Sequence, residues 1–123
     1  MTKEQSTIRR IESNKRLSAA VVNGGIVYVA GQVPDTLNAD VATQTREVLA
    51  KIDRLLNEAG SDKSSLLMAN VWLVDIKTFD QMNGVWEAWL PAGEAPARAT
   101  VEARLANPGL RVEIACVAAV RRA

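Results

Sequence analysis

The segment Asn23-Gly24-Gly25 limits what this chain can fold into more strongly than any other stretch. It stands between two apolar runs of β-forming residues, 18–22 and 26–30. Asn and Gly adopt positive φ at little cost, and the tight turns that join antiparallel strands require such residues. The segment therefore predicts a β-hairpin near the start of the chain. Residues 7–11, which mix β-branched and charged side chains, predict a preceding strand at the sheet edge.

An amphipathic helix is predicted from about residue 39 to residue 59. Apolar side chains recur there at helical spacing, and most charges lie on other faces. Gly60 is the expected end, because helices often stop at a residue in the left-handed conformation. The apolar run 71–74 then predicts a strand buried on both sides. The predicted core stripe of the helix is Val41, Val48, Leu49, Ile52, Leu55, Leu56 and Ala59.

A second helix is predicted after Thr78. Thr78 and Gln81 have the spacing of a capping box, and Pro91 with Gly93 ends the pattern. We interpret the Met and Trp residues of this helix as core rather than as a platform for ligand stacking. Its apolar stripe is Met82, Val85, Trp86, Trp89 and Leu90.

The C-terminal third predicts a second hairpin, formed by residues 96–102 and 110–114 around a turn at 107–109. Alternation places one polar set on a single side of the first strand: Arg98, Thr100, Glu102 and Arg104. Glu113 lies in the second strand within an apolar run, and we expect Arg98 and Glu113 to approach a common place. Arg98 is either a solvated edge charge or a clamp for a substrate carboxylate. Glu113 is either paired or hydrogen-bonded, or it handles a water proton.

The element order β-β-β-α-β-α-β-β predicts a single α+β domain over residues 1–123, with a mixed sheet and both helices on one face. The last strand is apolar in both alternating sets, so the opposite sheet face is not suited to water. We expect self-association through that face and a ligand site at the subunit boundary.

The composition excludes several kinds of active site. The chain has no His and one Cys, Cys116, so a single chain cannot hold a Ser–His–Asp triad, a Cys–His pair or a zinc site rich in His and Cys. Cys116 stands in an apolar run, which predicts a buried thiol. Fifteen basic and fourteen acidic residues give a formal charge of +1, which argues against nucleic acid as a partner.

The chain also lacks targeting signals of the membrane and secretory kind. Residues 1–6 have no apolar core typical of a signal peptide, and no segment approaches the ~20 apolar residues of a membrane span. We therefore expect a cytoplasmic protein without a membrane partner.

Four motifs in register along the chain resemble those of the RidA (YjgF) family of imine deaminases. They are Gly31-Gln32-Val33-Pro34, then Val74-Asp75 with Phe79, Asn83 and Glu87, then Pro96-Ala97-Arg98-Ala99-Thr100-Val101-Glu102, and finally Val112-Glu113-Ile114. The resemblance implies a chorismate-mutase-like fold assembled as a homotrimer with clefts between subunits. It also implies hydrolysis of 2-imino acids, or their enamine tautomers, to 2-keto acids and ammonia, without a metal or another cofactor.

The resemblance also implies roles for individual residues. Arg98 would hold the substrate carboxylate and Glu113 would orient or activate water. Backbone groups at Gly31 and Thr100 would position the substrate, and Asn83 matches a polar position near the site. The chain departs from the best-studied members at Leu17, Ala30 and Thr100, where they have tyrosine, serine and cysteine. The loss of the tyrosine and serine hydroxyls makes the expected cleft more apolar, so we expect an altered preference, toward bulkier imino acids.

Two other functions fit the sequence less well. One is a non-catalytic trimer that binds a small carboxylate metabolite, which the replaced tyrosine and serine favour. The other is ribonuclease activity or inhibition of translation, as in some relatives. The lack of His and an aromatic content of 4% argue against the second, because RNA recognition commonly stacks bases on aromatic rings.

Overall fold

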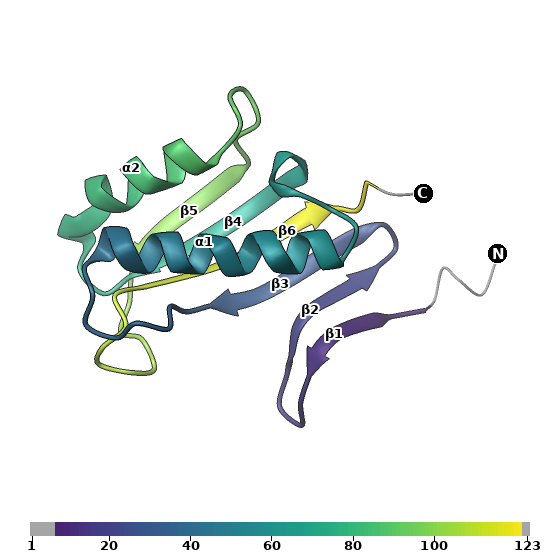
Figure 1. Cartoon of the computed structure of the whole chain (residues 1–123), viewed down its shortest axis with the longest axis horizontal. Coiled ribbons are helices and arrows are strands. Elements are labelled where there is room, and N and C mark those ends of the chain that lie inside the picture. Colours follow the sequence, from purple (N-terminus) through teal and green to yellow (C-terminus); the bar gives the residue numbers. More distant parts are fainter. Residues whose placement is uncertain (1–6, 122–123) are drawn as a thin grey trace.

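The computed structural model describes residues 7–121 as one six-stranded sheet in the order β1-β2-β3-β6-β4-β5, covered by two helices. Both helices lie on the same side of the sheet (Figure 1). The strands are β1 (Arg9–Ser13), β2 (Ser18–Asn23), β3 (Ile26–Gln32), β4 (Leu66–Leu73), β5 (Ala97–Glu102) and β6 (Val112–Ala119). The helices are α1 (Val41–Glu58) and α2 (Phe79–Trp89), with short 3-10 helices η2 (Lys63–Ser65) and η3 (Ile76–Thr78). The predicted α+β class and element order are confirmed.

The N-terminal hairpin forms where the sequence predicts it. β2 and β3 pair antiparallel with Asn23 opposite Ile26, so Gly24 and Gly25 make the two-residue turn. Their φ angles of +62° and +82° are those that glycine tolerates best. β1 occupies the sheet edge as predicted, although it begins two residues later than expected.

The predicted C-terminal hairpin is wrong. β5 runs parallel to β4 at the sheet edge, whereas β6 lies between β3 and β4 and is antiparallel to both. The turn at Asn107 does form, with the Leu110 amide donating to the Asn107 carbonyl oxygen at 3.0 Å, but it does not join paired strands. The apolar run of β6 suits the centre of the sheet, and the more polar β5 suits an edge.

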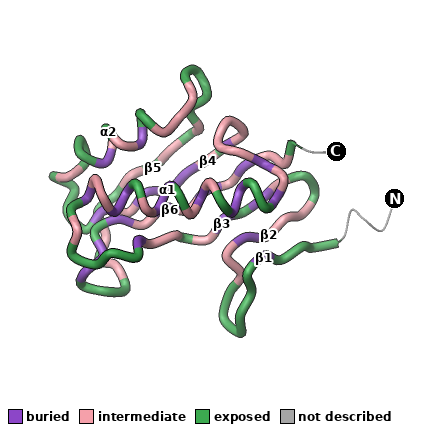
Figure 2. The backbone as a smooth tube through the Cα atoms, in the orientation of Figure 1, coloured by how far each residue is buried: buried purple, intermediate pink, exposed green. Residues whose placement is uncertain are grey.

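The core fills the space between the helices and the sheet. Every apolar residue predicted for the α1 stripe is buried. Buried residues, purple in Figure 2, follow the central strands, whereas β1 and most loops are exposed. α1 begins after Asp40, whose carboxylate accepts the Thr43 amide at 2.8 Å, and it ends before Gly60 at φ +86°. None of the helices within residues 7–121 has the length and apolar character to cross a membrane, and residues 1–6 lie outside the described part.

α2 packs as predicted but is capped differently. Met82 and Trp86 are buried, and Val85 with Trp89 packs against the core, which confirms their assignment as core residues. Thr78 is the N-cap residue, yet it makes no side-chain cap bond; its hydroxyl donates to the Asp75 carbonyl oxygen at 2.6 Å. The capping box is therefore wrong, because η3 runs directly into α2 and leaves no extended residue to form one.

A buried glutamine on α1 connects two loops that the sequence left unplaced. The Gln44 side-chain amide donates to the carbonyl oxygens of Thr36 at 3.1 Å and Gly109 at 2.9 Å. Its carbonyl oxygen accepts the Arg111 amide at 2.7 Å. One fully buried side chain thus holds the β3–α1 loop against the segment that leads into β6.

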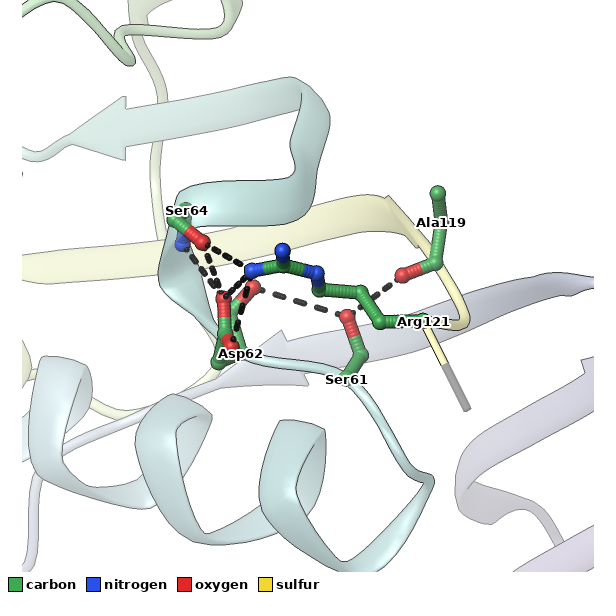
Figure 3. Close-up of polar contacts among 5 residues, drawn as sticks. All are labelled: Ser61, Asp62, Ser64, Ala119 and Arg121. Carbon is green, nitrogen blue, oxygen red and sulfur yellow. Dashed lines mark hydrogen bonds and ion pairs between the residues drawn. The ribbon is translucent and has the colours of Figure 1, made fainter. Parts of the chain in front are cut away.

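A polar cluster attaches the end of β6 to the connection between α1 and β4 (Figure 3). The Ser61 hydroxyl donates to the Ala119 carbonyl oxygen at 2.6 Å, and Arg121 bonds Asp62 at 3.3 Å and Ser64 at 2.8 Å. Hydrogen bonds from Ser64, and then the charge of Arg121, lower the pKa of Asp62 by favouring its ionised form. The C-terminal strand is therefore fixed at the end where it leaves the sheet.

We predict that Gln44→Leu lowers the free energy of unfolding by roughly 2–4 kcal/mol, because it removes three hydrogen bonds through which one buried side chain holds two loops together. Urea denaturation of this variant and of Gln81→Leu, an exposed control on α2, would measure the difference. The control should change the free energy by less than about 0.5 kcal/mol. Equal effects of the two substitutions would contradict this account of Gln44.

Candidate functional site

The second face of the sheet carries no helix and is largely apolar. Val27 and Val29 are buried under the helices, so Tyr28 between them points away from the helices and is 50% exposed. The pairing registers place Val21, Val117 and Val101 on that same face, and Val101 is also 50% exposed. We call this surface, formed by residues 21, 28, 72, 101, 113 and 117, the open face. Its composition supports the expectation of self-association, which stays a prediction.

Arg98 leaves the sheet on the opposite, helix-covered side. It is in register with Ala69 of β4, which is in register with Cys116 of β6, and both of these residues are buried core. Paired residues on neighbouring strands point to the same face. The polar set of β5 therefore faces α2, whereas Ala99 and Val101 lie on the open face and are exposed within this chain.

The Arg98 guanidinium lies among three side chains of α2. Its central carbon is 5.3 Å from the centre of the Trp86 ring and 5.6 Å from that of the Phe79 ring, above each ring. Nη1 donates to the Met82 sulfur at 3.9 Å. These three residues are spaced i, i+3 and i+7, so they share one face of the helix. Arg98 thus has aromatic and thioether contacts rather than a carboxylate partner.

The positive charge of Arg98 has no acidic side chain in direct contact within residues 7–121. Burial lowers the pKa of Arg98 from its ordinary value, and the more distant Glu87 opposes this shift. Within residues 7–121, Arg98 forms no ion pair and its only side-chain hydrogen bond is the one to Met82. A guanidinium has five N–H donors, so most of them are available to an anionic ligand.

Two other predicted residues lie near Arg98 in the fold. Thr100 follows it on the same side of β5, and its hydroxyl is buried without a hydrogen-bond partner in the described part of the chain. Buried polar groups usually have a hydrogen-bond partner, so its absence here is unusual, and it occurs two residues from Arg98. Asn83 follows Met82 on α2 and is half-buried.

Glu113 and Gly31 form a second group, on the other side of the sheet. Val112 and Ile114 are fully buried beneath the helices, so Glu113 between them points to the open face. A Cβ atom added at Gly31 would come within 2.0 Å of Glu113 Oε2. Gly31 is therefore needed for space: its lack of a side chain lets the carboxylate lie directly against β3.

The structure does not bring Arg98 and Glu113 together within one chain, contrary to expectation. β4 separates their strands, which therefore lie roughly 10 Å apart, and Arg98 is level with Cys116 rather than with Glu113. Their side chains also leave the sheet on opposite faces. The expectation assumed a hairpin that does not form. Leu17, 56% exposed, precedes β2 close to the edge remote from β5. The predicted site residues thus fall into three separate places.

Residues 7–121 hold neither a reactive thiol nor a cluster of metal-binding side chains. Burial raises the pKa of the Cys116 thiol to about 12, so it holds almost no thiolate at neutral pH, and the predicted buried thiol is confirmed. In residues 7–121 no three His, Cys, Asp or Glu side chains meet in a way that could hold a metal ion.

Sequence reasoning missed the contribution of α2 to the Arg98 environment. Phe79 was noted only as part of a motif, and Met82 and Trp86 only as core residues. Their shared spacing was visible, but not that β5 packs beneath them. The same reasoning gave Glu102 no structural role, yet its carboxylate accepts the Ile76 amide at 3.0 Å and so fixes the turn that starts α2 over β5.

Comparison with known proteins identifies the family. Residues 7–120 match the family model described as Endoribonuclease L-PSP. The RutC family protein YoaB of Escherichia coli is 47% identical over 114 residues, which cover 93% of this chain and 99% of that protein. The chain therefore belongs to the endoribonuclease L-PSP family, which the names of relatives also call RutC or YjgF.

Solved structures agree with this assignment. A YjgF family member from Neisseria meningitidis matches with a TM-score of 0.93 and 47% identity, covering 97% of this chain and 99% of that chain. A second member, from Mycobacterium tuberculosis, matches with a TM-score of 0.83 and 30% identity over 93% of this chain and 100% of that chain. The resemblance inferred from the four motifs is confirmed at the level of the family.

We predict that Gly31→Ala destabilises the protein by about 0.5–1.5 kcal/mol, because the added methyl group forces the flexible Glu113 side chain out of its present conformation. In the Glu113→Ala background, where this carboxylate is missing, the same substitution should cost much less. Urea denaturation of the four proteins of this double-mutant cycle measures the coupling. Additive effects would show that Glu113 does not lie against Gly31.

Proposed function

We propose that this protein hydrolyses 2-imino acids to 2-keto acids and ammonia, and that Arg98 binds the substrate carboxylate. The observation that carries the proposal is the Arg98 guanidinium, which is held against two aromatic rings with no carboxylate partner in the described chain. Arg in such a setting suits bidentate recognition of a carboxylate. Membership of the YjgF family, with its motifs around Arg98 and Glu113, supports the same function.

The chemistry needs little more than positioning. A protonated imine carbon is electrophilic, so water attacks it once the two are held in the right geometry, and orientation of this kind supplies up to ~7–11 kcal/mol in favourable systems. Glu113 serves as the group that orients the water and accepts its proton, and a placed general base typically adds roughly 10²–10⁴-fold. The carbinolamine formed then loses ammonia to give the keto acid.

The complete site, in this proposal, includes more than one copy of the chain. Arg98 lies on an edge strand, Leu17 lies close to the other edge, and Glu113 lies on the uncovered apolar face. In a cyclic homotrimer, one surface of each copy packs against a different surface of the next copy. Clefts form where the copies meet. Leu17 and Ala30, which lack the hydroxyls of tyrosine and serine, make the proposed cleft more apolar, which favours imino acids with larger apolar side chains.

We predict that Arg98→Ala lowers kcat/KM for iminobutanoate by roughly 10- to 150-fold, the value of one charge-assisted hydrogen-bond pair. Arg98→Lys should recover part of the loss, because it restores the charge without the planar fork. The imine is generated with an amino acid oxidase or dehydratase and its disappearance is followed. Absence of any acceleration over spontaneous hydrolysis, with several side chains tried, would reject the enzymatic function.

A second function, the binding of a small carboxylate metabolite without turnover, is favoured by one observation: Arg98 and Glu113 lie on opposite faces of the sheet in the chain. Glu113→Gln separates the two functions. The enzyme proposal predicts a fall in kcat of about 10²-fold or more with little change in the affinity for 2-ketobutyrate. A pure binding protein would show no imine turnover before or after the substitution, and unchanged affinity.

The family name also raises an RNA-directed activity. The near-neutral charge and the absence of His in this sequence give that activity no support. RNA added to the same preparations provides the check: binding that persists at ~200 mM salt, or cleavage that depends on Arg98, would favour it over imine hydrolysis.

A further inference from the structure

We propose that Phe79 and Trp86 are positioning residues that pack against the Arg98 guanidinium and so leave in-plane N–H groups available to a carboxylate ligand. This inference rests on the proposed role of Arg98 in carboxylate binding. It does not require that the ligand be turned over.

The first argument is geometric. The guanidinium carbon lies over both rings, at 5.6 Å and 5.3 Å from their centres. Aromatic rings attract a guanidinium through its faces, whereas carboxylates bind the N–H groups at its edge. Ring contacts and ligand contacts therefore use different parts of the same group. The rings fix the orientation of Arg98 without occupying its hydrogen-bond donors.

The second argument concerns the exposure of Phe79. Phe79 is 38% exposed and lies outside the buried core cluster. Core packing therefore does not explain why a large apolar side chain stands at the start of α2. Trp86, in contrast, belongs to the core and is 6% exposed. Contact with Arg98 is what the two residues share. The exposed ring thus has a role that core packing does not provide.

The third argument concerns what an unclamped arginine would do. Arg98 lies on an edge strand and has no ion pair in residues 7–121, so its long side chain would otherwise sample many rotamers. A ligand that binds a mobile side chain must order it, and pre-ordering removes that cost. Met82 adds a third contact on the same face of α2, with its sulfur 3.9 Å from Nη1. The cluster therefore gives affinity through pre-organisation rather than through direct contact with the ligand.

The test compares 2-ketobutyrate binding and imine turnover in ring-removing and ring-keeping variants. Phe79→Leu and Trp86→Leu should each weaken binding of 2-ketobutyrate, measured by calorimetry, by about tenfold. KM should rise by a similar factor while kcat changes less than about threefold. Phe79→Tyr and Trp86→Phe keep a ring over the guanidinium and should retain most of the affinity.

Val85→Ala is the matched control. Val85 is on the same helix and packs against the core, but it makes no ring contact with Arg98. Trp89 is unsuitable, because its ring centre is 5.6 Å from that of Trp86. The Val85 variant should lose stability and bind 2-ketobutyrate with unchanged affinity at a temperature where it is folded. Equal losses of affinity in the Trp86 and Val85 variants would overturn the proposal, because they would show a general loosening of α2.

A spectroscopic measurement covers the case in which Trp86→Leu fails to fold. The chain has three Trp residues, so Trp72→Phe with Trp89→Phe leaves Trp86 as the single emitter. Binding of 2-ketobutyrate should change its fluorescence, and Arg98→Met should abolish the change. An unchanged signal at saturating ligand would contradict the inference.

The outcomes separate this inference from the proposed function. If Arg98→Ala leaves 2-ketobutyrate binding unaltered, the assigned role of Arg98 fails, and both proposals fail with it. If Arg98→Ala weakens binding but the ring-removing variants do not, the positioning role alone is wrong. If the rings affect binding and no imine is hydrolysed, the positioning role stands and the enzymatic function is wrong.

Discussion

The contact between α2 and the edge strand β5 determines where Arg98 lies. Parallel pairing with β4 turns Arg98 toward the helices, and one stripe of α2 receives it. The start of α2 is fixed in turn by Glu102 from the far end of the same strand. Strand, turn and helix thus form one unit around the guanidinium. The guanidinium carbon lies over two aromatic rings, and the one side-chain hydrogen bond of Arg98 within residues 7–121 is to Met82, so most of its N–H donors stay available.

The sheet separates two kinds of surface, and this separation shapes the proposed function. On the helix-covered side lie Arg98 and the hydroxyl of Thr100, which has no hydrogen-bond partner within residues 7–121. On the open face lies Glu113, placed against Gly31 among apolar side chains. A single chain offers a binding group and a carboxylate that do not meet. Joining them requires the apolar face and the edges to be covered by further copies, so assembly and chemistry are linked in this proposal.

Much of the fold was predictable because it depends on local signals. The turn Asn23-Gly24-Gly25 fixed one hairpin, and helical periodicity ending at Gly60 placed α1. The pairing of β5 was not predictable from the same signals. A strand followed by a turn and a second strand suggests a hairpin, and no local pattern shows that β4 lies between these two strands. Arg98 and Glu113 were identified from their motifs, but their relative position depended on that pairing. The role of Gln44 could not be predicted, because no sequence pattern marks a glutamine within a helix as buried.

A crystal structure of the protein with 2-ketobutyrate bound would test the role of Arg98 without recourse to kinetics. Our account predicts that the ligand carboxylate lies within hydrogen-bond distance of the edge N–H groups of Arg98, with the guanidinium carbon still over the Phe79 and Trp86 rings. It further predicts that the pocket is closed by a second copy of the chain. A ligand bound elsewhere, or an Arg98 side chain that turns away from a bound carboxylate, would contradict it.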